Sequence, residues 1–141
     1  MANGDLLEAR LTESIIGAFY DVYNNLGYGF LEHVYVRALE RELRARGHLV
    51  AREVAVVIRY KGEEIAEQRL DIIVDHKVLI EIKSTHDLNK SAARQVYNYL
   101  KATNLEVGVL FHFGPLPRFY RMIHRNNKKN PLLSVQSDAS G

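Results

Sequence analysis

Cysteine is absent from this chain of 141 residues. The chain therefore has neither disulfides nor thiolate metal sites, which suits a reducing cytoplasm. Long hydrophobic runs are also missing, since the longest are far too short to span a bilayer. The first ten residues lack a basic segment followed by an apolar one, so we expect no secretory signal. These absences favour a cytoplasmic protein without membrane contact.

Motifs of several other enzyme classes are missing as well. The six histidines show no close metal-ligand spacing, such as two histidines four residues apart on one helix, so a zinc site is not expected. There is no glycine-rich phosphate loop and no internal repeat. Residues Ser84 to Asp87 include a hydroxyl, an imidazole and a carboxylate, but adjacent loop residues rarely converge as a catalytic triad requires. We expect them to form a helix-capping loop.

The composition predicts one globular domain, from residue 1 to 123. Hydrophobic residues make up 47% of the chain, which is enough for a substantial core. The 19 basic residues nearly balance the 17 acidic ones, so the net charge of +2 permits a polyanionic partner without demanding one. Residues 124 to 141 are rich in Asn, Lys and Ser, and we expect a polar, flexible tail there.

Hydrophobic periodicity predicts an α/β protein of the α+β type with the order ααβββαββ. Helices are expected from Thr12, as the N-cap, to Gly27, from about Phe30 to Arg46, and from Asn89 or Ser91 to Thr103. The first strand is expected at 53–60, and the next two are expected on either side of a turn at 75–77. Two more strands are expected at 107–113 and, as an edge strand, at 119–123. The first three strands are expected to be antiparallel.

The segment from Asp71 to Lys83 carries the main functional signal. Two apolar runs flank Asp75 to Lys77, which predicts a hairpin, and the period-two alternation of a strand places Glu81 and Lys83 on one face. If the loop has three residues, Asp71 lies directly opposite Glu81; a two-residue loop would turn Asp71 to the other face. Like charges across a strand pair destabilise a sheet, and a divalent cation is the simplest compensation.

Glu32 is a further acidic candidate on the second predicted helix. It lies beside the apolar stripe that includes Tyr35 and Leu39, so its carboxylate can point toward the sheet. The alternative is an ordinary solvated residue at the flank of the helix. A Glu-x-Lys on a strand is likewise often only an exposed charged face. Gln95 and Tyr99, one turn apart on the third helix, can be an ordinary amphipathic pair.

The chain resembles the GxxExxY protein family, a branch of the PD-(D/E)XK nuclease superfamily, from about Leu11 to Ile123. The resemblance is carried by several motifs in matching order and spacing: Gly29-Phe-Leu-Glu32-His-Val-Tyr35, Tyr60-Lys-Gly-Glu63, Asp71, Glu81-Ile-Lys83, Gln95-Val-Tyr-Asn-Tyr99 and Gly108 to Gly114. One departure is His112, where the family pattern usually carries asparagine. The resemblance implies a restriction-endonuclease-like core, with a mixed central sheet flanked by helices.

The same resemblance implies roles for individual residues. Asp71 and Glu81 correspond to the metal-binding carboxylates, Lys83 to the catalytic lysine, and Glu32 to an accessory acidic residue. Gln95 and Tyr99 resemble the QxxxY motif and, with Tyr35, are expected to position the substrate.

Such a site suits Mg²⁺, with Mn²⁺ as a substitute. Mg²⁺ is usually held by one or two carboxylates together with water and substrate phosphate oxygens. The backbone carbonyl of Ile82 lies close enough to add a ligand, and Glu32 can bind directly or through water. Lys83 would orient the attacking water and neutralise developing charge. The expected reaction is phosphodiester hydrolysis.

Two functional hypotheses follow from the sequence. The first is a metal-dependent nuclease that acts on DNA, with RNA as an alternative substrate. The second is a nucleic-acid-binding or protein-interaction module that keeps the fold without cleaving, for which the small net charge is the motivation. A homodimer would supply two active sites for a double-strand cut, but no sequence feature specifies an interface.

Overall fold

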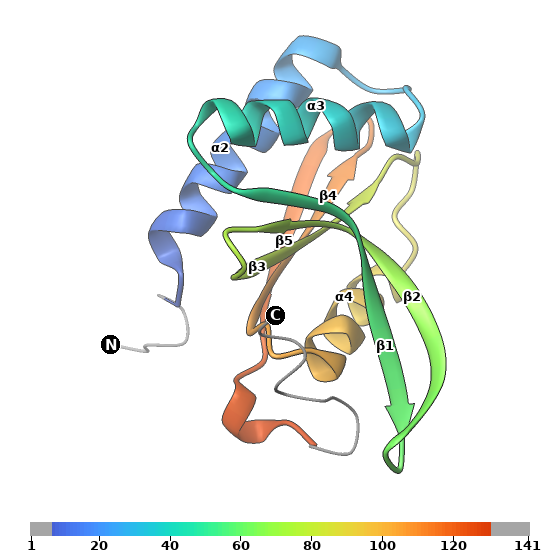
Figure 1. Ribbon diagram of the computed structural model, residues 1–141. Coiled ribbons are helices and arrows are strands. Elements are labelled where there is room, and N and C mark those ends of the chain that lie inside the picture. The colour runs from blue at the N-terminus through green and yellow to red at the C-terminus, as the bar shows by residue number, and fades with distance from the viewer. Residues whose placement is uncertain (1–6, 131–141) are drawn as a thin grey trace.

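The computed structural model describes residues 7 to 130 and has the predicted element order (Figure 1). Two helices, α2 (Ala9–Leu26) and α3 (Glu32–Ala45), precede three strands, β1 (Val50–Tyr60), β2 (Glu63–Val74) and β3 (Val78–Lys83). Helix α4 (Ser91–Ala102) leads to β4 (Val107–Phe113) and β5 (Pro117–Ile123). A short 3₁₀ helix, η1 (Asn126–Lys128), follows. Within the described range, no helix is long and apolar enough to cross a membrane.

The five strands form one mixed sheet in the order β1-β2-β3-β4-β5. All neighbours are antiparallel except β3 and β4, which run parallel and are joined by α4. A parallel pair needs such a crossover connection. The predicted mixed sheet is therefore confirmed, and so are the three antiparallel strands at its start.

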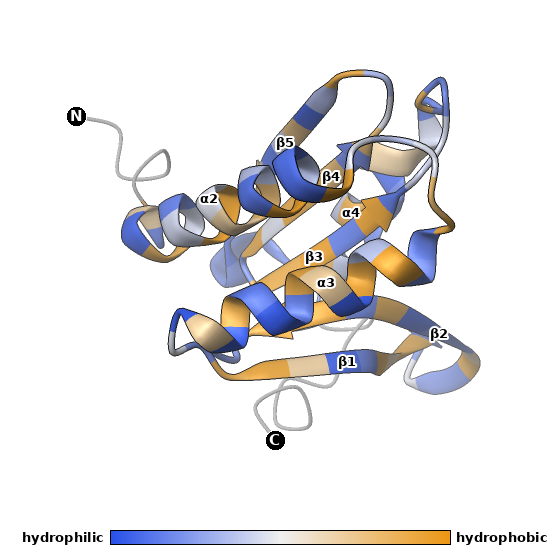
Figure 2. Ribbon diagram, turned by 90° about the horizontal axis from the view of Figure 1, so that it is seen from above, coloured by the Kyte–Doolittle hydropathy of each residue, from blue (hydrophilic) through white to orange (hydrophobic). Residues whose placement is uncertain are grey.

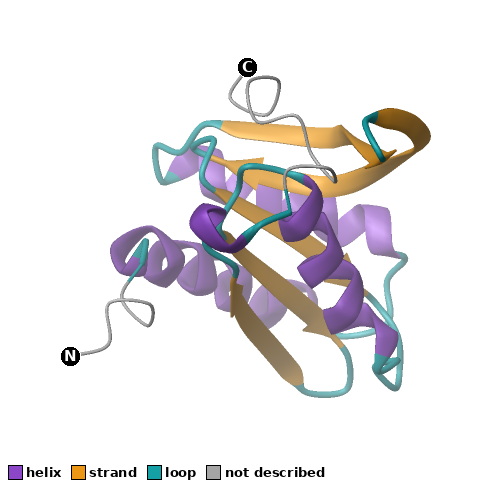
Figure 3. Ribbon diagram, turned by 90° about the horizontal axis from the view of Figure 1, so that it is seen from below, coloured by secondary structure: helices purple, strands orange, loops and turns teal. Residues whose placement is uncertain are grey.

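Helices α2 and α3 cover one face of the sheet, and α4 covers the other. Figure 2 shows the sheet from the side of α2 and α3, and Figure 3 shows it from the side of α4. On the first face, the ring of Phe19 stacks on Phe111 with a centroid distance of 4.3 Å. On the second face, Val96 packs so close to Gly108 that a Cβ there would lie 2.7 Å from Val96 Cγ1. Gly108 thus lets α4 approach the centre of the sheet.

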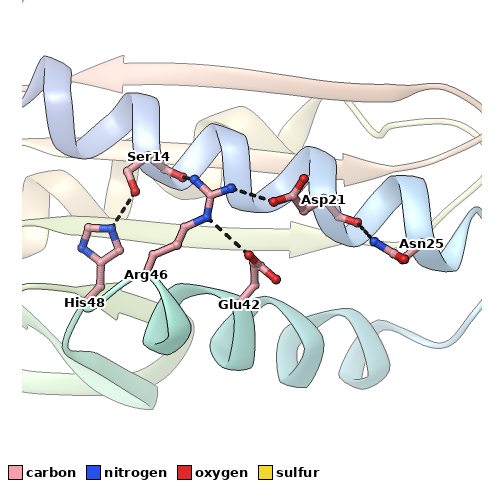
Figure 4. A network of polar contacts seen from close by, with 6 residues as sticks. All are labelled: Ser14, Asp21, Asn25, Glu42, Arg46 and His48. Atoms are coloured by element: carbon pink, nitrogen blue, oxygen red, sulfur yellow. Dashed lines mark hydrogen bonds and ion pairs between the residues drawn. The ribbon is translucent and has the colours of Figure 1, made fainter.

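Polar contacts join α2 to the C-terminal end of α3 (Figure 4). The Arg46 guanidinium bonds the Asp21 carboxylate at 2.6 Å and the Ser14 carbonyl oxygen at 3.3 Å. His48 then bridges the Ser14 hydroxyl and the Asp75 carboxylate, each at 2.8 Å. The turn between β2 and β3 is therefore tied to both helices.

Two boundaries differ from the sequence prediction. Thr12 is not the N-cap of the first helix, because α2 begins at Ala9 and the Thr12 hydroxyl donates to the Glu8 carbonyl oxygen within it. Residues 124 to 130, expected to be part of a flexible tail, bond to the domain: Lys129 Nζ reaches the carbonyl oxygens of Thr103 and Leu105. The rest of the predicted tail, 131–141, lies outside the described residues.

Candidate active site

The site forms where β2 and β3 diverge. Their ladder runs from Val74 and Val78 to Ile72 and Ile80 and ends there. In place of the next ladder bonds, the Ile82 N–H donates to Asp71 Oδ2 at 2.7 Å, and the Asp71 N–H donates to Glu81 Oε1 at 3.4 Å. The two carboxylates thus occupy the gap between the strands.

The turn at residues 75–77 explains this placement. The turn has three residues, which is the loop length that places Asp71 on the same face as Glu81. Asp75 and His76 adopt positive φ values of 52° and 58° in it. An odd loop length sets the pairing of Ile73 with Leu79. Two residues further along each strand, Asp71 and Glu81 meet as the register predicts.

Lys83 lies beside Glu81, on the more solvent-exposed side of the site. Its ammonium group is 3.8 Å from Glu81 Oε2. The Glu81 side chain is only 6% exposed, whereas that of Lys83 is 27% exposed. Because β3 alternates, both side chains project from the face that α4 covers. A buried carboxylate and a more accessible cation therefore lie next to each other on this face of the sheet.

Glu32 approaches from the other side of the sheet as the first residue of α3. Gly29, at φ 115°, turns the chain before it, and the Ser84 hydroxyl donates to the Phe30 carbonyl oxygen at 2.5 Å. This bond ties the loop before α3 to the end of β3. The Glu32 carboxylate, although exposed to solvent, feels the charges of Asp71 and Lys83 and bonds the Ser84 amide.

The crowding of carboxylates shifts their pKa values upward. Burial and the neighbouring Asp71 charge raise the pKa of Glu81 to about 8, against the opposing effect of Lys83. Burial also raises the pKa of Asp71, although hydrogen bonds from the Ile82 amide and the Glu81 carboxyl oppose this. For Glu32, burial and then Asp71 raise the pKa. Near neutral pH the Asp71 and Glu81 pair therefore holds a proton in common.

These residues supply a minimal donor set for a hard divalent cation. Within residues 7 to 130, no group of three or more His, Cys, Asp or Glu side chains has a metal-binding arrangement. Two carboxylates do face each other, however, and burial raises the pKa values of both even though Lys83 lies close enough to lower them. Mg²⁺ needs only one or two carboxylates when water and phosphate complete its shell. Asp71 and Glu81 fit that requirement.

The other predicted site residues have different surroundings. Gln95 Nε2 donates to the Tyr99 hydroxyl at 3.0 Å, which donates to the Arg69 carbonyl oxygen at 3.4 Å. Burial and then the Glu81 charge raise the pKa of Tyr99, so its hydroxyl lies within the field of the carboxylates. The side chain of Ile82 is buried, and the ligand role of its carbonyl stays a prediction.

Tyr35 has contacts that hold the loop before α3. Its side chain is fully buried and stacks on Phe113, so it does not line the site. The Tyr35 hydroxyl donates to the Gly27 carbonyl oxygen at 2.6 Å and accepts from the Phe30 amide at 3.2 Å. Tyr35 therefore fixes the loop that leads to Glu32, and a part in positioning the substrate stays a prediction.

Sequence reasoning missed Glu53, a fourth acidic residue near the site. Glu53 lies on β1 between Arg52, which pairs with Ile72, and Val54, which pairs with Leu70. It adopts φ 53°, and its charge raises the pKa of Asp71. A regular hairpin would not place Glu53 near Asp71, and the sequence does not reveal the irregularity between Ile58 and Arg59 that shifts the register.

Comparisons with known proteins agree with this architecture. No match was found among the curated proteins. Among solved structures, the crystal structure of SSO0001 has a TM-score of 0.55 and 21% sequence identity, covering 84% of this chain. The chain spans 60% of the length of that protein, and the likeness concerns the fold alone. A model of the PD-(D/E)XK nuclease superfamily matches residues 9–125. The chain therefore belongs to the PD-(D/E)XK nuclease superfamily.

Proposed function

We propose that this protein is a metal-dependent nuclease that hydrolyses phosphodiester bonds of DNA. The observation that carries the proposal is the meeting of Asp71, Glu81 and Lys83 at the divergence of β2 and β3. Within the superfamily, the motifs at Gly29, Glu32 and Tyr35 favour the GxxExxY branch. The substrate assignment to DNA rather than RNA is part of the proposal.

Each residue has a defined part in the proposed reaction. Asp71 and Glu81 would hold Mg²⁺, or Mn²⁺ in its place, with Glu32 contributing directly or through water. The ion, when bound, lowers the pKa of a coordinated water and polarises the phosphoryl group. The Lys83 ammonium orients the attacking water and offsets the negative charge that develops on the phosphoryl oxygens. Gln95 and Tyr99, which are hydrogen-bonded to each other, would position Lys83, the attacking water or a substrate phosphate.

Two observations favour the alternative, a binding module without catalysis. One carboxylate oxygen of Asp71 already accepts a hydrogen bond from the Ile82 amide. Among the described residues, no group of three side chains has a metal-binding arrangement. In that case the pair of carboxylates would be retained without a metal. The two proposals differ in one measurable respect, which is cleavage that depends on metal and on Lys83.

The test is cleavage of plasmid and single-stranded DNA by the purified protein with Mg²⁺ or Mn²⁺. We expect Lys83→Ala to lower the cleavage rate by at least about 100-fold, because electrostatic stabilisation of the transition state is lost. Lys77→Ala is the matched control, since Lys77 is an exposed lysine at the other end of the same hairpin. Cleavage that survives Lys83→Ala, or that proceeds equally in EDTA, would contradict the proposal.

A further inference from the structure

Past the N-terminal end of α4, the sheet face that carries the site continues onto β4, whose residues are buried, and onto β5, where Arg118 and Tyr120 are exposed (Figure 3). Lys83 lies beside His112 in the parallel pair, and His112 lies beside Arg118 in the antiparallel pair. Residues in register on neighbouring strands share a face of the sheet. With strands about 4.8 Å apart, the backbones at Lys83 and Arg118 are roughly 10 Å apart.

A cavity of about 390 Å³ lies on this part of the face. The loop that follows β3 forms one wall, and the turn between β4 and β5 forms the other. Its lining residues are His86, Asp87, Leu88, His112, Pro115, Leu116, Arg118 and Tyr120. The cavity is therefore separated from Lys83 only by the width of β4.

The walls combine an aromatic ring, an aliphatic side chain and a cation. Tyr120 is 41% exposed and Leu116 is 61% exposed, which leaves both free to contact a ligand. Arg118 is exposed, and neither its guanidinium nor the Tyr120 hydroxyl has a polar partner among residues 7–130. The rim also carries an exposed carboxylate, Asp87, whose partner is the His86 ring at 3.3 Å.

His112 adds a buried polar atom without a partner. The residue is only 4% exposed, and its Nε2 lies 2.8 Å from the Thr85 carbonyl oxygen, so Nε2 carries the hydrogen. Nδ1 is then a free acceptor, and it has no hydrogen bond within the described part of the chain. Buried acceptors are nearly always satisfied. Because Nδ1 itself is covered by neighbouring atoms, the His112 ring forms part of the cavity wall without offering this acceptor to the cavity.

We propose that this cavity binds one unpaired nucleotide of a nucleic-acid strand, next to the phosphodiester that is cleaved. The inference rests on the proposed nuclease function. The base would stack on Tyr120 against Leu116, and Arg118 would bind the adjoining phosphate. A base inside a duplex cannot enter, because its faces are stacked and its edge is paired. The substrate class is therefore a strand that is unpaired beside the cut.

Exposed aromatic side chains beside the cavity agree with such a substrate. Tyr28 and Phe30, in the loop before Glu32, are both exposed, and the Tyr28 ring lies 6.4 Å from the His86 ring. Aromatic rings along a basic groove are the usual means of holding unpaired bases. The loop before α3 thus adds exposed aromatic rings next to the His86 wall of the cavity.

Binding of labelled oligonucleotides to the full chain in EDTA tests the inference without catalysis. We expect a short single-stranded DNA to bind about tenfold more tightly than the same sequence as a duplex. Tyr120→Ala should weaken single-strand binding by about tenfold, since one stacked base is lost. Arg118→Ala should reduce the slope of log affinity against log salt by about 0.7, as expected for one phosphate contact on a single strand.

Two matched variants serve as controls, and melting curves check that every variant folds. Tyr60→Ala removes an exposed tyrosine at the far end of β1, and Arg41→Ala removes an exposed arginine on α3, behind the sheet. Neither should change binding. Equal affinity for duplex and single strand, or equal effects of Tyr120→Ala and Tyr60→Ala, would overturn the inference. An RNA strand of the same sequence reports which nucleic acid the cavity prefers.

The two proposals can fail separately. If Lys83→Ala abolishes cleavage but Tyr120→Ala changes neither binding nor the preference for single strands, the nuclease function stands and the cavity inference falls. If single-strand binding depends on Tyr120 and Arg118 but no metal supports cleavage, the cavity is a nucleotide site and the nuclease function falls.

Discussion

Glu81 combines burial with a charged neighbour, and this has a consequence for stability. Its side chain carries a pKa of about 8 in the folded protein, against an ordinary value of 4.5. Between these pH values the folded state holds a proton that the unfolded chain releases. The free energy of unfolding therefore falls as pH rises from about 4.5 to about 8, by at most about 1.4 kcal/mol per pH unit for one proton.

Glu81→Gln should remove this pH dependence. In metal-free solution, we expect the variant to gain stability relative to the wild type as pH rises from about 5 to about 8, because glutamine has no proton to lose. Urea unfolding at several pH values measures the difference. Glu13→Gln, at an exposed position on α2, is the control. Parallel pH profiles for wild type and Glu81→Gln would contradict the assignment of the shared proton.

At the scale of secondary-structure elements, the sequence predicted the strands of the site but not all of their surroundings. The three-residue turn fixed Asp71 opposite Glu81, because period-two alternation leaves no other choice once the loop length is set. Glu53 could not be predicted, because a regular hairpin with a two-residue turn at Lys61 and Gly62 would place Arg52 opposite Asp71. Only the irregularity between Ile58 and Arg59 brings Glu53 to that position.

Tyr35 shows a second limit of sequence patterns. A motif records that a residue type recurs, but it does not distinguish a side chain that contacts substrate from one that holds a loop. The burial of Tyr35 and its two backbone bonds show that it holds a loop, which the motif alone does not indicate. The helix start was misplaced for a related reason, since the Thr12 hydroxyl can bond a backbone carbonyl oxygen within a helix as well as cap one.

The bridge through His48 joins α2 to the turn between β2 and β3. His48→Ala should lower the free energy of unfolding by about 1–2 kcal/mol, because the hydrogen bonds to Ser14 and Asp75 are both lost. Chemical denaturation measures the change, with His33→Ala, an exposed position on α3, as the control. An effect no larger than that of the control would mean that the bridge contributes nothing to stability.

For the whole molecule, metal binding should couple to global stability. A cation that binds only the folded state stabilises it by about 2.7 kcal/mol at 100 times its Kd. We expect Mg²⁺ to raise the melting temperature by several degrees, with a larger rise at pH 8 than at pH 6, because the cation must displace the proton shared by Asp71 and Glu81. EDTA should reverse the rise.

Calorimetric melting with Mg²⁺ titration measures this effect. Asp71→Asn and Glu81→Gln should abolish the rise, whereas Glu13→Gln should retain it. A metal-induced rise of the same size in all variants would place the cation elsewhere on the protein.

The hydrogen bond from Ser84 to Phe30 spans 54 positions of the chain, and the Tyr23 hydroxyl reaches the Gly114 carbonyl oxygen across 91. Contacts between such distant segments form slowly, because a large loop must close before they are made. Helices α2 and α3 need only local contacts and can form earlier. During refolding, the placement of Glu32 beside the site should therefore be among the last steps, whereas Asp71 and Glu81, which are only 10 positions apart in one hairpin, can meet earlier.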